Sequence, residues 1–96
     1  MPRVALSARA LADIERLSGF LAQRDPKAAS AAIEAIFDAL AVLQRHPLVG
    51  RSLEGAIREL VVSYGESGYV ALYRFQPRRD RIEVLAIRRQ REAGYG

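Results

Sequence analysis

The chain has 96 residues, of which 50% are hydrophobic and 27% charged, with a formal net charge of +4. This length predicts one domain covering residues 1–96. The absence of cysteine excludes disulfides, thiolate metal sites and a cysteine nucleophile, and the single histidine argues against a zinc site, so we expect no metal or cofactor. No apolar run approaches the ~18 residues of a membrane span, and the first residues are too short an apolar stretch for a signal peptide. We therefore expect a cytoplasmic protein without a membrane partner.

Two amphipathic helices are predicted in the first half of the chain, after a short strand at residues 1–6. Ser7 is placed to cap a helix from Ala8 to about Gln23, and the pair Asp25-Pro26 supplies a capping side chain and a first-turn proline for the next helix. His46-Pro47 should end that helix, because proline restricts the residue before it. Apolar residues recur at spacings of three and four in both segments, as amphipathic helices require: Leu11, Ile14, Leu17 and Leu21, then Ile33, Ile36, Phe37, Leu40 and Leu43.

The periodicity changes to two beyond Pro47, which predicts strands. Residues 48–56 should form a loop, and the strands should cover 57–63, 69–75 and 81–87, joined by turns at 65–68 and 77–80. On the last strand, strict alternation places Ile82, Val84 and Ala86 opposite Glu83, Leu85 and Ile87. The expected fold class is a two-layer α+β fold, β-α-α-β-β-β, with an antiparallel helix hairpin packed on an antiparallel sheet.

Positive charge is concentrated at the C-terminal end. Residues 1–48 carry six basic and five acidic side chains, whereas residues 74–96 carry seven basic and three acidic ones. Fourteen of the fifteen basic residues are arginine, whose planar fork of donors suits phosphates and carboxylates. A polyanion or an acidic partner is expected to dock there.

The candidate site residues follow or flank the predicted strands. Arg88, Arg89, Arg91, Glu92 and Tyr95 come directly after the last strand. Arg51, Arg58 and Arg74 precede it, and we expect them to converge with the first group on one surface if the strands pair in order. Arginines with an exposed tyrosine suit RNA binding, and RNA cleavage would then rely on arginine for charge and on Tyr95 or Glu92 for proton transfer. A solvated basic tail, or a surface for an acidic protein, remains the alternative. His46 is interpreted as a helix-end residue rather than a catalytic one.

The chain resembles the small toxins of the RelE/ParE superfamily, which belong to type II toxin–antitoxin operons. The resemblance spans essentially the whole chain and rests on the runs "HPLVGRSLEGAIRELVV", "SGYVALYRF" and "IEVLAIRRQREAGY". Its most specific parts are the pair Gly50-Arg51, the triplet Arg58-Glu59-Leu60, the pair Tyr73-Arg74 and the run from Leu85 to Arg88 with its Arg/Gln tail.

The resemblance implies one of two activities. RelE-like members are ribosome-dependent mRNA endonucleases, and on their pattern Arg89 and Tyr95 match the C-terminal catalytic pair, with Arg91 between them. ParE-like members poison DNA gyrase and have no known nuclease chemistry. The central arginine of the RelE branch usually follows the Ser-Gly-Tyr turn, where this chain has Val70, and Arg58 is the only basic residue on the preceding strand. These departures favour the ParE-like activity.

Either activity implies a small acidic antitoxin that neutralises the toxin. In the gyrase reading, a charged contact surface for target and antitoxin is expected from Arg51, Arg58, Arg74, Arg88, Arg89 and Arg91. In the nuclease reading, the ribosome with its mRNA is the partner, and the catalytic residues are Arg89, Arg91 and Tyr95.

Overall fold

A computed structural model describes residues 1–64 and 67–90 of the chain. In these ranges the elements are, in order, β1 (Arg3–Leu6), α1 (Ala8–Ala22), α2 (Pro26–Val42), β2 (Arg51–Ser52), β3 (Ile57–Tyr64), β4 (Ser67–Gln76), the short 3₁₀ helix η1 (Pro77–Arg79) and β5 (Arg81–Arg89). Each predicted helix and strand is present within a few residues of its expected bounds. Residues 65 and 66 of the predicted 65–68 turn lie outside the described residues, and residues 67 and 68 belong to β4.

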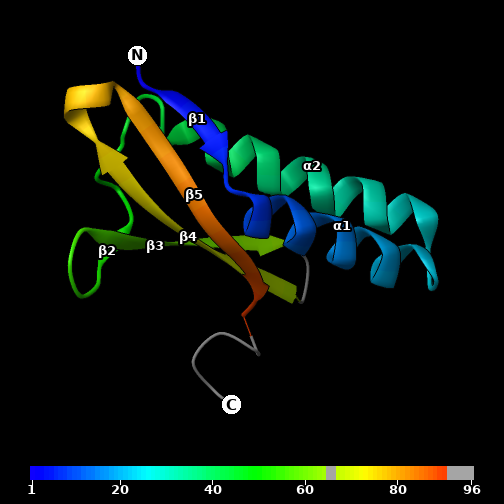
Figure 1. The fold of residues 1–96 in the computed structure, drawn as a ribbon. Helices are drawn as coiled ribbons and strands as arrows, with labels where there is room; N and C mark the ends of the chain where they lie inside the picture. Colours follow the sequence, from blue (N-terminus) through cyan, green and yellow to red (C-terminus); the bar gives the residue numbers. More distant parts are fainter. Residues whose placement is uncertain (65–66, 91–96) are drawn as a thin grey trace.

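The two helices form one layer and a five-stranded sheet the other, as the two-layer prediction requires (Figure 1). The strand order is β1-β5-β4-β3-β2. The sheet is mixed rather than antiparallel throughout, because β1 runs parallel to β5 with Val4 opposite Ile82. Residues 48–56 also differ from the predicted loop, since β2 pairs with β3 through Arg51 and Glu59.

Side-chain caps fix the starts of both helices. Ser7 Oγ accepts a hydrogen bond from the Ala10 N–H at 3.0 Å, and Asp25 Oδ1 accepts one from the Lys27 N–H at 3.0 Å. Each cap satisfies backbone donors that the first helical turn leaves unpaired. Helix α2 ends at Val42, earlier than the His46-Pro47 pair predicted, because tight turns carry the chain from there to His46.

The core lies between the helices and one face of the sheet, where Leu17, Ile36, Tyr73 and Val84 are among the buried residues. Two residues of the predicted apolar stripes differ from expectation: Leu11 is 48% exposed and Phe37 is 45% exposed. On α1 the buried stripe instead includes a carboxylate, Asp13, which is only 8% exposed. This buried charge requires partners.

A β-bulge in β5 changes the predicted alternation of that strand. Leu72 of β4 pairs with Ala86, and the next residue, Tyr73, pairs with Val84, so Leu85 has no partner on β4. The extra residue shifts every later side chain to the other face. Ile87 therefore joins the core with Ile82 and Val84, and the prediction that it lies opposite them is wrong.

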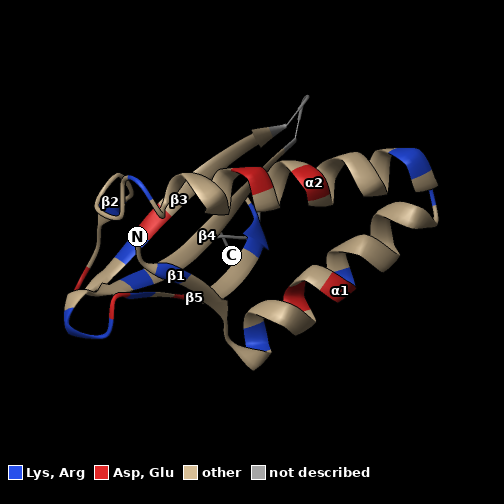
Figure 2. Ribbon diagram, turned by 90° about the horizontal axis from the view of Figure 1, so that it is seen from above, with Lys and Arg blue, Asp and Glu red and all other residues tan. Residues whose placement is uncertain are grey.

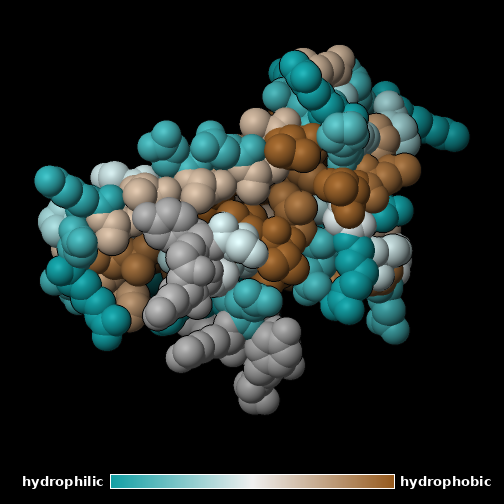
Figure 3. All heavy atoms as spheres, turned by 180° about the vertical axis from the view of Figure 1, so that it is seen from behind, coloured by the Kyte–Doolittle hydropathy of each residue, from teal (hydrophilic) through white to brown (hydrophobic). Residues whose placement is uncertain are grey.

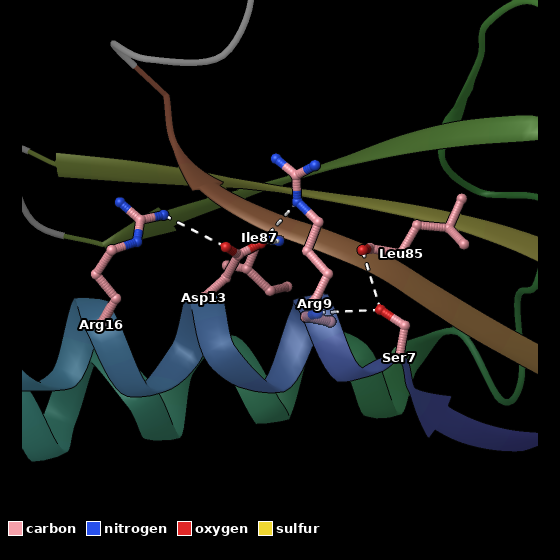
Figure 4. Close-up of polar contacts among 7 residues, drawn as sticks. Ser7, Arg9, Asp13, Arg16, Leu85 and Ile87 are labelled. Carbon is pink, nitrogen blue, oxygen red and sulfur yellow. Dashed lines mark hydrogen bonds and ion pairs between the residues drawn. The ribbon is translucent and has the colours of Figure 1, made fainter.

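Helix α1 covers the edge of β5 that β1 leaves open, as Figure 4 shows. Strand β1 pairs with β5 only as far as Val84. Beyond that point, Ser7 Oγ donates to the Leu85 carbonyl at 3.0 Å, and Asp13 Oδ2 accepts from the Ile87 N–H at 3.0 Å. Two arginines neutralise the carboxylate from the same helix, Arg16 at 3.4 Å and Arg9 at 3.9 Å.

Replacing Asp13 should therefore loosen the contact between α1 and β5. Asp13→Ala leaves the Ile87 N–H buried without its acceptor, and we expect a loss of about 1–3 kcal/mol in the free energy of unfolding by urea denaturation. Glu15→Ala, on the exposed side of the same helix, is the matched control and should change it by less than about 0.5 kcal/mol. Equal losses in the two variants would contradict a specific role for Asp13.

Candidate functional site

The candidate arginines of the sheet lie on two opposite faces. Arg58 is directly opposite Tyr73, and Arg89 is directly opposite Tyr69. Because directly paired residues share a face and both tyrosines are buried among the core residues, Arg58 and Arg89 lie on the helix-covered face. The other three described arginines, Arg51, Arg74 and Arg88, lie on the open face. The structure does not bring the five onto one surface.

On the helix-covered face, three residues hold the loop that follows α2. Tyr73 Oη donates to the Pro47 carbonyl at 2.9 Å and accepts from the Gly50 N–H at 2.9 Å. Arg58 Nη1 donates to the carbonyls of Leu48 at 3.1 Å and Gly50 at 2.8 Å. We call Gly50, Arg58 and Tyr73 the loop clamp.

Arg89 lies beside α1. Its guanidinium is 5.2 Å from the centre of the Phe20 ring, and Arg24 approaches the same ring at 5.6 Å. Such cation–π contacts hold the charged group against a ring that is itself 40% exposed. Arg89 therefore belongs to the α1 side of the molecule, away from Arg88.

Two arginines of the open face are paired with carboxylates. Arg51 Nη2 is 2.8 Å from Glu59 Oε1, and Arg74 contacts Glu83 Oε1 through both Nε and Nη2 at 2.8 Å. Figure 2 shows basic and acidic positions side by side on these strands. Much of the positive charge of Arg51 and Arg74 is therefore offset within the protein.

The centre of the open face is apolar. Val61 pairs with Val70, and Leu72 pairs with Ala86, so four apolar residues cross three neighbouring strands. Val61 is 49% exposed, whereas Val70 is 3% and Ala86 4% exposed. The accessible apolar surface here therefore comes from Val61 and the partly exposed Leu72, with charged side chains around it, as at many protein-binding surfaces.

Other candidates lie outside this surface. Arg91, Glu92 and Tyr95 lie outside the described residues, so their predicted roles remain predictions. His46 follows α2 and lines a hollow with Pro47, Leu48, Val49 and Phe75. Over residues 1–64 and 67–90, the His, Asp and Glu side chains form no group of three that could hold a metal ion. In the same ranges, neither helix is long and apolar enough to cross a membrane.

Sequence analysis missed Asp13 and the hydroxyl of Tyr73. The position of Asp13 was predictable from the helical period. It lies three residues after Ala10 and four before Leu17, so its carboxylate falls on the buried stripe of the helix. The hydrogen bonds of the Tyr73 hydroxyl could not be predicted from the sequence, because its partners Pro47 and Gly50 are more than twenty residues away and only the fold brings them together.

Two glycine substitutions should have opposite effects on stability, because Gly50 lies in the loop clamp and Gly19 lies on an open side of α1. A Cβ on Gly50 would lie 2.7 Å from Tyr73 Oη and 2.9 Å from the Glu59 carbonyl oxygen, so Gly50→Ala should lower the melting temperature. Gly19→Ala is the control: nothing lies within 4 Å of its added Cβ, and α1 should gain about 0.5–1 kcal/mol. A Gly50→Ala protein as stable as the parent would contradict the close packing of the clamp.

Comparison with known proteins identifies the family. A family model described as the ParE toxin of the type II toxin–antitoxin system, parDE, matches residues 4–94. Toxin RelE3 of Caulobacter vibrioides is 38% identical over 92 residues, which cover 96% of this chain and 98% of that protein. Toxin RelE1 of the same organism is 39% identical over 71 residues, covering 74% of this chain and 76% of that protein.

Solved structures of such toxins share the fold. A chain of the chromosomal ParDE system from P. aeruginosa has a TM-score of 0.74 at 22% identity, covering 93% of this chain and 96% of that chain. A chain of the E. coli RelBE toxin–antitoxin complex has a TM-score of 0.69 at 16% identity, covering 92% of this chain and 95% of that chain. The chain therefore belongs to the ParE toxin family, within the RelE/ParE superfamily of type II toxin–antitoxin toxins.

Proposed function

We propose that residues 1–96 act as a single ParE-like toxin domain that stops growth by poisoning DNA gyrase. The observation that carries this proposal is the apolar centre of the open sheet face, where Val61 is 49% exposed and Leu72 is partly exposed beside the buried Val70 and Ala86. A toxin that inhibits a protein target needs a surface of this kind, because desolvated apolar contacts supply most of the binding free energy at such interfaces.

The charges of the same face argue against phosphate chemistry there. A nuclease without a metal depends on cationic donors at the scissile phosphate, and losing one such donor costs roughly 3 kcal/mol. Val70 stands where the RelE branch has its central arginine, and a valine donates nothing to a phosphate. Arg51 and Arg74 are paired with Glu59 and Glu83, which weakens their attraction for an added anion.

Each candidate arginine has a proposed role in target binding. Arg51, Arg74 and Arg88 border the apolar centre and contribute charge complementarity and association rate. Arg58 acts indirectly, because its hydrogen bonds position the loop after α2. Arg89, on the α1 side, and Arg91, which follows it in the sequence, extend the basic surface and serve the antitoxin as well.

The antitoxin is proposed to be a small acidic protein whose amphipathic segment covers the apolar surface beside α2. One hollow lies between β1 and the C-terminal half of that helix, and a second is lined by the segment that follows the helix and by Phe75 of β4. Val4, Leu6, Phe37 and Leu40 contribute to one, and Leu48 and Val49 to the other, while Figure 3 shows hydrophobic surface gathered on this side of the molecule. Apolar hollows on a protein of net charge +4 suit an acidic amphipathic partner. The solved relatives are parts of toxin–antitoxin systems, which supports such a partner.

A gyrase cleavage assay tests the target and the surface together. The purified chain should trap gyrase on DNA and produce double-strand breaks, and Val61→Asp should abolish this effect because it places a charge at the exposed part of the apolar centre. Val42→Asp, at a 46% exposed valine of α2, should retain it. Full activity of the Val61→Asp protein would contradict the proposed contact surface, and no effect of the parent chain on gyrase would contradict the target.

A RelE-like mRNA endonuclease is the second candidate, and the names of the two Caulobacter relatives favour it. In that case Arg89, Arg91 and Tyr95 are the catalytic residues and the ribosome with its mRNA is the partner. Tyr95→Phe separates the candidates: we expect it to leave growth arrest within about twofold of the parent, since a contact surface loses little with one hydroxyl. A nuclease that uses this hydroxyl for proton transfer would lose about 100-fold or more in cleavage rate.

A further inference from the structure

The turn between β4 and β5 concentrates positive charge at one end of the molecule. Arg78 and Arg79 lie in η1, with Arg74 before it on β4 and Arg81 after it on β5. Arg3 of β1 joins them, because it pairs with Arg81 and its N–H donates to the Asp80 carbonyl at 3.0 Å. We call these five arginines the turn cluster. With Asp80 and Glu83 they carry a formal charge of +3, most of the +4 of the whole chain.

The protein neutralises little of this charge. Glu83 is shared between Arg74 at 2.8 Å and Arg81 at 3.7 Å, and Arg81 Nε is buried with no hydrogen-bond partner in the described part of the chain. Arg3, Arg78 and Arg79 are exposed, and no carboxylate of residues 1–64 or 67–90 lies within ion-pairing distance of them. Three guanidinium groups are therefore free to bind an external anion.

The backbone holds the tip of this cluster in a defined position. The Asp80 N–H donates to the Pro77 carbonyl at 3.1 Å, and Asp80 has a left-handed φ of 49°, which aspartate tolerates better than most residues. The turn therefore presents Arg78 and Arg79 side by side at the end of the sheet, far from the α1–α2 connection (Figure 1). Little chain entropy is left to lose when a ligand binds the tip.

We propose that the three unpaired arginines of the turn cluster, Arg3, Arg78 and Arg79, bind the phosphate backbone of duplex DNA. Helix η1 has no buried residue, and none of the described residues between Arg74 and Arg81 is an exposed large apolar one. The exposed Leu48 and Val49 line a hollow with Phe75 on the helix-covered face instead. Protein partners require an apolar centre, whereas DNA-binding surfaces are polar and strongly positive. Duplex DNA presents one charge per ~1.7 Å of its axis, so several phosphates lie within reach of a compact group of guanidinium forks. A single strand carries about half as many phosphate charges per unit length.

Arg3, Arg78 and Arg79 are not among the residues of the apolar centre of the open face, and their binding to DNA does not depend on the identity of the target protein. If the target is an enzyme that holds DNA, the cluster adds a contact to the bound duplex. If the target is not gyrase, DNA binding by the free toxin is still expected.

Fluorescence anisotropy with a short labelled DNA duplex tests the proposal. Arg78→Gln with Arg79→Gln should weaken binding about tenfold at low salt and reduce the slope of log affinity against log salt by about 2. The control is Arg24→Gln with Lys27→Gln, which removes the same charge from exposed positions at the α1–α2 connection. At about 0.1 M salt it should change affinity less than about twofold, since charges farther than about 10 Å are then screened. Circular dichroism establishes that both double variants are folded.

Three results would overturn the proposal. The first is equal weakening by the two double variants, which would indicate attraction to net charge alone. The second is tighter binding of single-stranded RNA, or of a labelled poly-glutamate peptide, than of the duplex. The third is the absence of measurable duplex binding by the parent chain at low salt.

Discussion

One extra residue in β5, Leu85, determines which side chains face the helices and which face away. If the alternation that begins at Ile82 and Val84 continued unbroken, Arg88 would lie beneath the helices and Ile87 on the open face. Such an arrangement would bury a charge and expose a large apolar side chain, and both are unfavourable. The bulge instead places Ile87 in the core, leaves Arg88 opposite Val70 on the open face, and brings Arg89 against Phe20.

Helix α1 and the loop clamp anchor the two layers at separate places. Asp13 fixes the helix to β5 just past the bulge, and Tyr73 and Arg58 fix the loop after α2 to β4 and β3. Both anchors act on the helix-covered face. On the open face, three surface ion pairs join Arg51 to Glu59 and both Arg74 and Arg81 to Glu83, and such pairs contribute little stability. Val61, which is 49% exposed at the apolar centre, is available to a binding partner, and this connects the fold to the proposed inhibition of a protein target.

Local signals made much of the fold predictable. The caps at Ser7 and Asp25 are confirmed, since each acts on donors within three residues of itself. What depends on distant parts of the chain was not predictable: the parallel pairing of β1 with β5, and a bulge that no glycine marks. The same holds for the site. Sequence analysis identified the arginines, but only the strand register shows that Arg58 and Arg89 lie on one face and Arg51, Arg74 and Arg88 on the other.

The proposed action on DNA gyrase can be tested by pulse-labelling DNA and protein synthesis in the first minutes after induction of the chain without its antitoxin. If the toxin acts on gyrase through a protein contact, DNA synthesis stops first and double-strand breaks accumulate while translation continues. If translation stops first and DNA remains intact, the toxin does not act through gyrase, and the C-terminal Arg89, Arg91 and Tyr95 become the residues to study.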